Sequence, residues 1–224
     1  MRSGILRQAS VSIAALVIAT VALGFCYPLA VTGIAQLFFP AKANGSLIYS
    51  GGKLAGSALL GQSFTDAKGN PLPRYFQPRP SNAGAGYDGS SSGASNLGPS
   101  NPTLINEVSQ RVRAYRQFNH LAPNAAVPVD AVTASGSGLD PDISIQNALD
   151  QAPRVAQARH LAAAQVVALL HQHTTPAEWG FLSEPAVNVL QLNMALDHSF
   201  PDQPGKSNLS ANGQEKSSRL DGLR

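Results

Sequence analysis

An uncharged run near the N-terminus constrains this chain more than any other part of its sequence. No Asp, Glu, Lys, Arg or His occurs between Arg7 and Lys42, and most of the intervening residues are apolar. As a helix with a rise of about 1.5 Å per residue, such a run can cross about 30 Å of hydrocarbon. The sequence therefore predicts a transmembrane helix over residues 10–38, kinked near Pro28.

The alternative is a signal peptide that is cleaved after export. A basic start precedes the run, and Ala41-Lys-Ala43 has small residues at the spacing of a cleavage site. The apolar core of a signal peptide covers only about 7–15 residues. The length of the run therefore favours a retained anchor in the lipid bilayer.

The charges that flank the run indicate its orientation. Arg2, Arg7 and the terminal amine precede it, whereas Lys42 and Lys53 follow it. Positively charged flanks tend to stay on the cytoplasmic side. We therefore expect residues 1–9 in the cytoplasm, a single pass through the cell inner (plasma) membrane, and the rest of the chain outside.

Small side chains form a stripe along the predicted span. Ala15, Ala19 and Ala22 recur at helical spacing. Small residues let a second helix approach closely in a membrane. Ala15 and Ala19 are therefore candidate contacts with a partner subunit.

The remainder of the chain is long enough for one domain with a core of its own. The single cysteine, Cys26, lies in the apolar run, so no disulfide is expected. A net charge of +3 without a block of Lys or Arg gives no support for nucleic-acid binding. The expected fold class is α+β, with one N-terminal transmembrane helix followed by a single mixed α/β extracytoplasmic domain over 39–200. Residues 201–224 are polar and are predicted to be a disordered tail.

Local patterns predict the elements of that domain. In chain order they are a hairpin within 45–62, a flexible loop over 81–102, a helix from Pro102 capped by Asn101, a strand over 127–133, a helix over 143–150 capped by Asp140 or Asp142, further helices from Pro153 to Arg159 and over 162–171, and a strand or helix start over 187–192. Arg111, Arg113 and Arg116 lie off the apolar stripe of the helix after Pro102 and are expected to face solvent.

Several short patterns match enzyme motifs but lack the required setting. Residues 84–89 fit a dinucleotide fingerprint and residues 89–93 fit a nucleophile elbow around Ser91. Both motifs need a strand before them and a helix after them, and both fall in a predicted loop. His171 and His173 are two apart on a helix, so their side chains point in different directions. We expect no catalytic residue and no metal site on this chain.

A set of ordered segments resembles one protein family. They are Asn44–Leu47, Gly56–Gln62 with Phe64, Tyr75–Ser81 (Tyr-Phe-Gln-Pro-Arg-Pro-Ser), Ser95–Pro102, Val127–Pro141, Arg154–Arg159 (Arg-Val-Ala-Gln-Ala-Arg) and Pro185–Asp197. Together they resemble the C subunit of the Kdp potassium-transporting ATPase. The resemblance covers roughly residues 10–198, behind one N-terminal span.

The resemblance implies an accessory, non-catalytic subunit of a high-affinity, ATP-driven potassium import complex. Its partners would be a channel-like potassium subunit, a P-type ATPase subunit that carries the catalytic residues, and a very small helical subunit. It also implies a role in assembly and as a catalytic chaperone that raises the affinity of the ATPase subunit for ATP. Potassium would be the transported ion of the complex.

The family resemblance also marks one residue associated with ATP. The matching position is Gln165, in the stretch Leu161-Ala-Ala-Ala-Gln165. This stretch is similar to the Leu-Ser-Gly-Gly-Gln signature of ABC transporters, with Ala in place of Ser and both glycines. An N-in anchor would place Gln165 outside the cell, whereas ATP is used inside, so an ordinary helix-surface role for Gln165 stays equally open.

Two loops are candidate contacts with partner subunits. The loop 95–102 carries Ser95, Asn96, Ser100 and Asn101, and the loop 133–140 carries Ser135 and Ser137. Their side chains and backbone carbonyls suit contacts with partner loops or with the entry route of the ion.

Two other functions of the chain stay open beside the accessory subunit. They are a membrane-anchored extracytoplasmic hydrolase and an anchored ligand-binding module.

Overall fold

The computed structural model describes residues 2–201 of the chain. The chain divides into two compact units, one ending at Leu59 and one beginning at Leu60. The predicted disordered tail lies outside the described residues from position 202 on. Helices and strands both occur, and one N-terminal apolar helix precedes them, as the sequence predicted.

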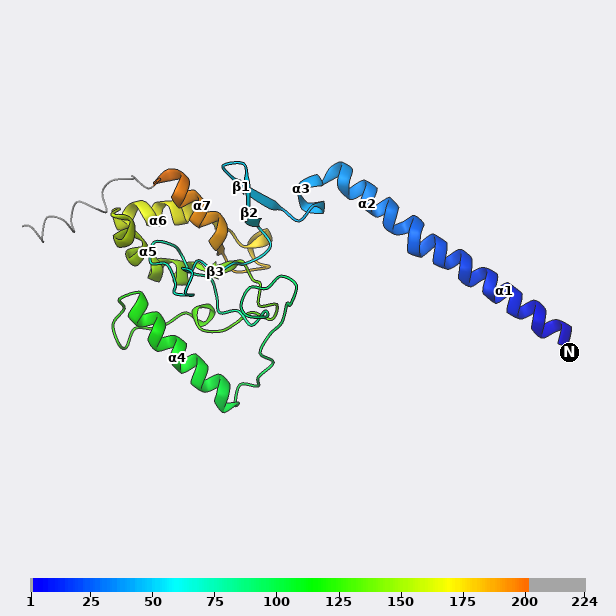
Figure 1. Ribbon diagram of the computed structural model, residues 1–224, viewed down its shortest axis with the longest axis horizontal. Coiled ribbons are helices and arrows are strands. Elements are labelled where there is room, and N and C mark those ends of the chain that lie inside the picture. Colours follow the sequence, from blue (N-terminus) through cyan, green and yellow to red (C-terminus); the bar gives the residue numbers. More distant parts are fainter. Residues whose placement is uncertain (1, 202–224) are drawn as a thin grey trace, which may run out of the picture. The chain divides into compact units, whose positions relative to one another are not determined.

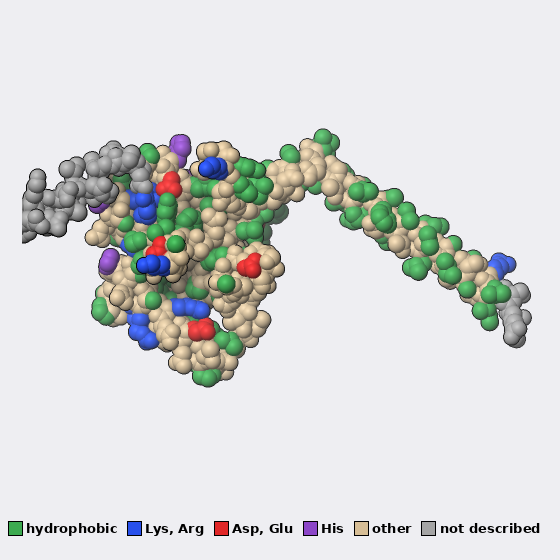
Figure 2. Space-filling model, in the orientation of Figure 1, with side chains coloured by type: hydrophobic (Ala, Val, Ile, Leu, Met, Phe, Trp, Pro, Cys, Tyr) green, Lys and Arg blue, Asp and Glu red, His purple; other side chains and the backbone are tan. Residues whose placement is uncertain are grey.

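The first unit begins with the predicted apolar helix (Figure 1). It comprises α1 (Arg2–Val21), the π-helical turn η1 (Ala22–Cys26) and α2 (Tyr27–Phe38). Within the described residues it is the one helix that is long and apolar enough to cross a membrane. Apolar side chains are spread along its visible face, and a basic side chain shows only near its N-terminal end (Figure 2). The expected irregularity lies at η1, just before Pro28.

A short helix and a hairpin complete the first unit. Helix α3 (Pro40–Ala43) precedes β1 (Leu47–Ser50) and β2 (Lys53–Ser57), which pair antiparallel. Gly51 and Gly52 form the turn with φ of +55° and +77°, values that glycine adopts without steric cost. The predicted hairpin is therefore confirmed.

The described residues of the second unit, 60–201, contain a small antiparallel sheet and four α-helices. The strands are β3 (Asp142–Ser144), β4 (Thr174–Thr175) and β5 (Ala186–Asn188), in the order β3-β5-β4. The helices are α4 (Pro102–Phe118), α5 (Ile145–Arg159), α6 (Ala163–Gln172) and α7 (Val189–Ser199). Figure 1 shows α5, α6 and α7 grouped together, with α4 apart from them.

The core of this unit lies among α5, α6, α7 and the sheet. Small residues on α5 let the neighbouring elements approach it closely. The core residues include Phe76, Ile143, Ala148, Ala152, Val155, Val166, Leu170, Val187, Leu192 and Leu196. Burial of these apolar side chains is the main favourable term for folding the unit.

The helix after residue 101 begins where the sequence predicted. The Asn101 Oδ1 accepts a hydrogen bond from the Thr103 amide at 2.8 Å, and Pro102 occupies the first turn. The segment 187–192 was predicted to be a strand or the start of a helix. It contains both, because β5 ends at Asn188 and α7 starts at the next residue. The helix predicted over 162–171 is α6.

The predicted strand over 127–133 is wrong. Residues Val129–Ala131 form a short 3-10 helix, η2. Asp130 within it accepts hydrogen bonds from the Ser144 amide and hydroxyl, both at 2.8 Å. This side-chain pairing replaces the ladder that a strand would have made.

The predicted start of α5 also needs correction. Its cap is Ser144, whose hydroxyl accepts the Asn147 amide at 3.2 Å, whereas Asp142 lies in β3. Pro153 does not begin a helix but lies inside α5. A proline inside a helix removes one backbone hydrogen bond. Because buried Ala152 and Val155 continue the core face on either side of it, packing offsets that loss.

The connection over 81–102 was predicted to be flexible, but residues 81–93 follow a fixed path against the 137–138 turn. The Ser81 hydroxyl donates to the Gly138 carbonyl at 2.6 Å, and the Gly93 amide donates to the Ser137 carbonyl at 2.9 Å. Gly138 has φ of +67°, and a Cβ there would lie 2.6 Å from the Gly93 carbonyl oxygen. The Gly/Ser composition therefore serves close backbone packing rather than disorder.

Candidate functional site

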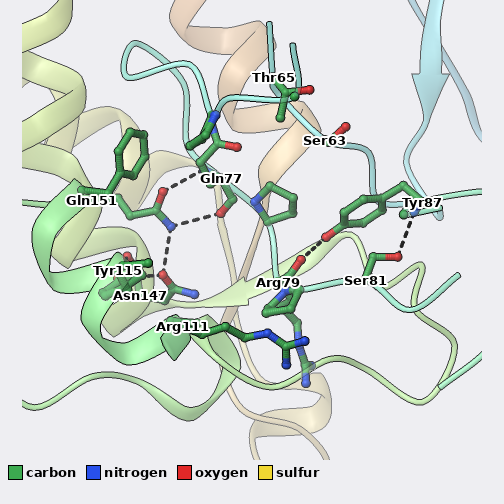
Figure 3. A pocket seen from close by; sticks show the side chains of 18 of the residues that line it. Ser63, Thr65, Gln77, Arg79, Ser81, Tyr87, Arg111, Tyr115, Asn147 and Gln151 are labelled. Carbon is green, nitrogen blue, oxygen red and sulfur yellow. Dashed lines mark hydrogen bonds between the residues drawn. The ribbon is translucent and has the colours of Figure 1, made fainter. Parts of the chain in front are cut away.

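A cavity of about 490 Å³ lies in the second unit, between two loop segments and two helices. Figure 3 shows Gln151, Asn147 and Tyr115 on one side of it and Arg79, Ser81 and Tyr87 on the other. The lining residues that matter here are Ser63, Thr65, Gln77, Arg79, Ser81, Tyr87, Arg111, Tyr115, Phe118, Asn119, Asn147 and Gln151. Three prolines of the lining, Pro71, Pro78 and Pro80, have no amide donor and stiffen the wall.

The wall around Gln77 is fixed by a side-chain amide from α5. Gln151 accepts the Gln77 amide at 2.7 Å and donates to the Gln77 carbonyl at 3.0 Å and to Asn147 Oδ1 at 2.9 Å. Gln151 is fully buried, so each of these groups would be costly to leave unpaired. The Gln77 side chain in turn donates to the Phe64 carbonyl at 3.0 Å.

A second amide clamp holds the preceding residue. The Asn193 Oδ1 accepts the Phe76 amide at 2.9 Å, and its Nδ2 donates to the Phe76 carbonyl, also at 2.9 Å. The backbone of this loop therefore pairs with two helix side chains as it would with a neighbouring strand. The segment Tyr75–Ser81 is positioned by α5 and α7 rather than by a sheet.

Arg154 lies at the centre of this network. Its Nε donates to Asn119 Oδ1 at 2.8 Å, its Nη2 to Gln151 Oε1 at 2.8 Å, and its Nη1 to the carbonyls of Tyr75 (3.0 Å) and Pro73. The guanidinium also lies 4.3 Å from the Phe118 ring centroid. Burial lowers the pKa of Arg154 to about 10, so it remains charged at neutral pH.

Helix α4 is tied to α5 by Tyr115. The Tyr115 hydroxyl donates to Asn147 Oδ1 at 2.9 Å, and Asn147 donates to the Asp130 carboxylate at 2.9 Å. Burial raises the pKa of Tyr115 well above its usual range, with the charges of Asp150 and Asp130 acting in the same direction. Tyr115 is therefore a neutral hydrogen-bond donor across the physiological pH range.

The two arginines of the cavity are each paired with an acid of this chain. Arg79 Nη1 lies 2.7 Å from Asp140, and Arg111 Nη2 lies 3.0 Å from Glu107. Arg111 also donates to the Val132 carbonyl at 3.3 Å, and Arg116 donates to the Ala125 carbonyl. The prediction that Arg111 and Arg116 face solvent is therefore wrong, because both hold loops against α4.

Tyr87 closes the wall opposite α5. Its hydroxyl donates to the Arg79 carbonyl, and burial raises the pKa of Tyr87 above its usual range, with Asp140 adding to the shift. Like Tyr115, it is a neutral donor committed to the chain itself. The polar groups of the cavity thus mostly bond to one another, an arrangement suited to holding a surface in shape.

Gln165 lies away from this cavity, in the first turn of α6. Its Oε1 accepts the Ala162 amide at 3.1 Å, and its side chain is exposed. A capping box has two bonds, and this is the one made by the residue inside the helix. The other is absent, because Ala162 has no side-chain acceptor. The residue therefore has a local structural use, to close the start of α6.

The predicted contact residues of the two loops fall into different roles. Asn101 caps α4, and the Ser137 hydroxyl accepts the Leu139 amide at 3.1 Å. Ser95, Asn96 and Ser100 are exposed side chains of the loop before α4. The Ser135 and Ser137 hydroxyls lie 3.4 Å apart in the adjacent turn. Hydrogen bonds from residues 92 and 93 to Ser137 join the two loops. In the separate first unit, Ala15 and Ala19 are exposed on the helix surface.

The enzyme-like motifs have no supporting geometry. Residues 84–93 lie in a connection that contains neither helix nor strand, and the Ser91 amide donates to the Asp88 carbonyl at 3.0 Å. His171 lies in the last turn of α6, and His173 is the C-cap residue after Gln172. Across residues 2–201, no group of three or more His, Cys, Asp or Glu side chains is placed to hold a metal ion.

Sequence reasoning missed the residues that organise the cavity, Gln151, Arg154 and Asn193. A signal was present, since all three are polar residues on the apolar faces of α5 and α7, next to Ala152, Val155 and Leu192. A polar residue in such a position is buried and must find partners. The two clamped residues, Phe76 and Gln77, could not be identified as those partners from spacing alone.

Comparison with known proteins assigns the family. The family model for the K+-transporting ATPase, c chain (KdpC) matches residues 9–198. The chain is 54% identical over 191 residues to the potassium-transporting ATPase KdpC subunit of Mycobacterium tuberculosis (strain ATCC 25618 / H37Rv), covering 85% of this chain and 98% of the relative. The subunit of the same name from Rhodospirillum rubrum is 52% identical over 196 residues, with 88% and 96% covered. That from Caulobacter vibrioides is 54% identical over 183 residues, with 81% and 88% covered. The chain therefore belongs to the KdpC family of potassium-transporting ATPase subunits.

Proposed function

We propose that the chain is a non-catalytic accessory subunit that stabilises the assembly of an ATP-driven potassium importer. The observation that carries this proposal is one apolar span joined to a domain whose buried polar side chains bond to backbone and side-chain groups of the same domain. Such a domain offers a shaped surface to partners. It offers no paired nucleophile and base at its cavity.

The partners would be the channel-like potassium subunit, the P-type ATPase subunit and the very small helical subunit. An exposed apolar loop supports a role within a complex: Trp179, Phe181 and Leu182 are 87%, 75% and 60% exposed. Large clusters of exposed apolar side chains mark sites of interaction with a protein, a membrane or a ligand. The polar loops 95–102 and 133–140 would add contacts near the route of the ion.

The domain over 39–200 would lie outside the cell, with residues 1–9 in the cytoplasm. Arg2, Arg7 and the terminal amine before the span, against Lys42 and Lys53 after it, support this orientation by one positive charge. In that orientation the chain would act on potassium entry and on assembly from the outer side. ATP would be bound and hydrolysed by another subunit.

The chaperone effect on ATP affinity would then pass through subunit contacts. The side-chain oxygen of Gln165 accepts the Ala162 amide at the start of α6, and this bond supports a structural use of the residue. A change in ATP affinity requires only that the chain bind one conformation of the pump more tightly than another. Direct contact between ATP and Gln165 is not needed.

The test is a pull-down of the tagged full-length chain, in mild detergent, from potassium-starved cells. We expect the pump subunits to copurify and the eluate to show potassium-stimulated ATPase activity. A chain that purifies alone would contradict the proposal. Hydrolytic activity of that lone chain, lost in Ser91→Ala, would instead establish the anchored hydrolase.

A further inference from the structure

The chain leaves the apolar helix through a turn that hydrogen bonds hold in place. The side-chain amides of Gln36 and Asn44 each donate to the other's side-chain oxygen, at 3.1 and 3.0 Å. The Ser46 amide donates to the Ala41 carbonyl, and the Ala58 amide donates to the Ser46 carbonyl, both at 2.9 Å. The hairpin β1–β2, which follows α3 in Figure 1, is therefore tied to the end of α2 rather than joined to it by a free linker.

One face of this hairpin is apolar. Leu47 and Tyr49 alternate along β1, so their side chains lie on the same face. Leu54 of β2 pairs across the strands with Tyr49 and joins that face. The three residues are 46%, 61% and 59% exposed. The first unit, as described from residue 2, therefore leaves this apolar face open.

A hairpin with an open apolar face needs a surface to cover it. Two strands alone are at best marginally stable in water, and they become stable when an apolar face packs against something else. The hairpin belongs to the unit that ends at Leu59 and contains the apolar helix. The nearest surface for a segment tied to the end of a span is the boundary between lipid and water.

The polar groups of the hairpin suit that boundary. Ser50 and Lys53 pair across the strands on the face opposite Tyr49. Tyr residues are enriched where a membrane meets water, and Lys side chains near the end of a span extend to the headgroup layer. The sequence has no Asp or Glu before Asp66, so no acidic side chain of the span or hairpin would repel lipid phosphates.

The length of the helix leaves its depth in a bilayer undetermined. The apolar helix covers Gly4–Phe38, 35 residues, which is about 52 Å at a rise of 1.5 Å per residue. The hydrocarbon layer is only about 30 Å thick. A span longer than the hydrocarbon tilts or shifts, and anchoring residues at the interface contribute to its final position. An anchor at the end of α2 would therefore set how deep the helix lies.

We propose that the hairpin β1–β2 lies in the lipid interface at the point where the chain leaves the membrane. Leu47, Tyr49 and Leu54 contact lipid, and Lys53 reaches the headgroups. This contact fixes the depth of the span. The occupant of the apolar face is lipid, because the face is tied to the end of a span and its surroundings carry positive charge alone. The inference rests on the proposed role as a membrane-anchored subunit.

Fluorescence quenching tests which face of the hairpin contacts lipid. Cys26 is replaced by Ser, and a nitrobenzoxadiazole group is attached to the new thiol of Leu54→Cys or, as the matched control, of Ser50→Cys. Position 50 is exposed and lies near the same turn on the opposite face. The labelled full-length chain is reconstituted into vesicles of phosphatidylcholine and phosphatidylglycerol. We expect quenching by 5-doxyl lipid to be about threefold stronger at position 54, and quenching by aqueous iodide to be stronger at position 50.

Two results would overturn the proposal. Equal quenching by lipid at the two positions would show that the apolar face is not the one that contacts lipid. A probe at position 54 that neither lipid nor iodide quenches would show that protein covers this face. If the labelled chains still recover pump subunits, the accessory role stands and only the lipid contact is wrong. A native chain that recovers no pump subunits would instead overturn the proposed function.

The native thiol measures the effect of the hairpin on the span. Cys26 lies in η1 and is exposed, so a probe attached to it reports the depth of the middle of the helix. Leu54→Asp places a charge on the apolar face, and Ser50→Asp places the same charge on the opposite face. We expect the ratio of quenching by 12-doxyl and 5-doxyl lipids to change about twofold for Leu54→Asp and to stay unchanged for Ser50→Asp. An equal ratio in both variants would contradict a role of the hairpin in setting the depth of the span.

Discussion

The N-terminal apolar helix and the domain after Leu60 use internal contacts to opposite extents. The domain buries amide and guanidinium side chains and pairs them internally, as Gln151, Arg154 and Asn193 do. The apolar helix instead exposes large apolar side chains along its length, among them Leu16, Leu23 and Leu37. The comparison indicates that internal contacts hold the domain, whereas the apolar helix leaves its side chains to its surroundings.

The largest expected effect on the domain comes from removing its central cation. Arg154→Ala leaves oxygen atoms of Asn119, Gln151 and Tyr75 without their donor in a buried site. Since each lost partner costs about 1–3 kcal/mol, the free energy of unfolding should fall by about 4 kcal/mol. Urea unfolding of the detergent-solubilised chain, followed by circular dichroism, measures this.

Arg154→Lys is the matched control for that variant. It keeps the charge but loses the planar fork that reaches several oxygens, so its loss of stability should be intermediate. If Arg154→Ala changed the unfolding free energy by less than about 1 kcal/mol, the domain would not depend on its internal polar network.

The next effect concerns the close backbone packing beside the cavity. Gly138→Ala forces an L side chain to φ of +67° and brings its Cβ to 2.6 Å from the Gly93 carbonyl oxygen. We expect a loss of about 2–3 kcal/mol in the free energy of unfolding. Gly136→Ala, where a Cβ meets nothing within 4 Å, should be nearly neutral in the same unfolding measurement. Similar losses in both variants would mean that the 81–93 connection is not fixed against this turn.

A smaller effect is expected at Gln165. Gln165→Ala removes the acceptor for the Ala162 amide and should lower the free energy of unfolding by about 0.5–1 kcal/mol. Gln165→Glu keeps an acceptor and adds a negative charge at the helix N-terminus, so it should recover that stability.

The KM for ATP of the assembled complex separates the two roles of Gln165. We expect it to be unchanged in Gln165→Ala. A several-fold rise in KM with unaltered stability of the chain would show that Gln165 acts on nucleotide rather than on the fold.

The smallest effect is a pH dependence at Asp142. Burial, and then the charge of Asp140, raise the pKa of Asp142 above its ordinary value of 3.8. An acid with a raised pKa in the folded state contributes stability that is fully present below pH 3.8 and is lost as pH rises through the folded pKa. Because the group is partly exposed, the contribution should be only a few tenths of a kcal/mol.

Asp142→Asn should therefore flatten this part of the stability profile, while it still accepts the Asn188 hydrogen bond. Asp66 is a control of opposite sign, because hydrogen bonds from Asn70 lower its pKa. Its contribution is present above pH 3.8 and is lost on acidification. Unfolding curves at pH 4 and pH 7 that move alike for both Asn variants would contradict these assignments.

Sequence patterns predicted most of the regular elements. Charge-free length identified the span, Gly51-Gly52 identified the hairpin turn, and Asn101-Pro102 identified the start of α4. In each case the signal is local, because it depends on residues adjacent in the chain. The same reasoning failed for Val129–Ala131 and Pro153, where contacts with distant residues decide the conformation.

The cavity was harder to predict than the fold. Its walls combine loops near Gln77 and Tyr87 with helices that follow much later in the chain. A glutamine or arginine on an apolar helix face predicts burial, but it does not identify the backbone groups that will bind it. The π-helical turn before Pro28 was likewise expected only as a kink, because its hydrogen-bond shift depends on the path of the whole helix.

The most direct test of the accessory role compares the potassium-stimulated ATPase activity of the pump with and without this chain. The remaining subunits are expressed alone, and the purified full-length chain is then added back in lipid. The account predicts that activity and ATP affinity are lost without the chain and return with it, while the chain alone hydrolyses no ATP. Full activity of the other subunits alone, or ATP hydrolysis by the isolated chain, would contradict it.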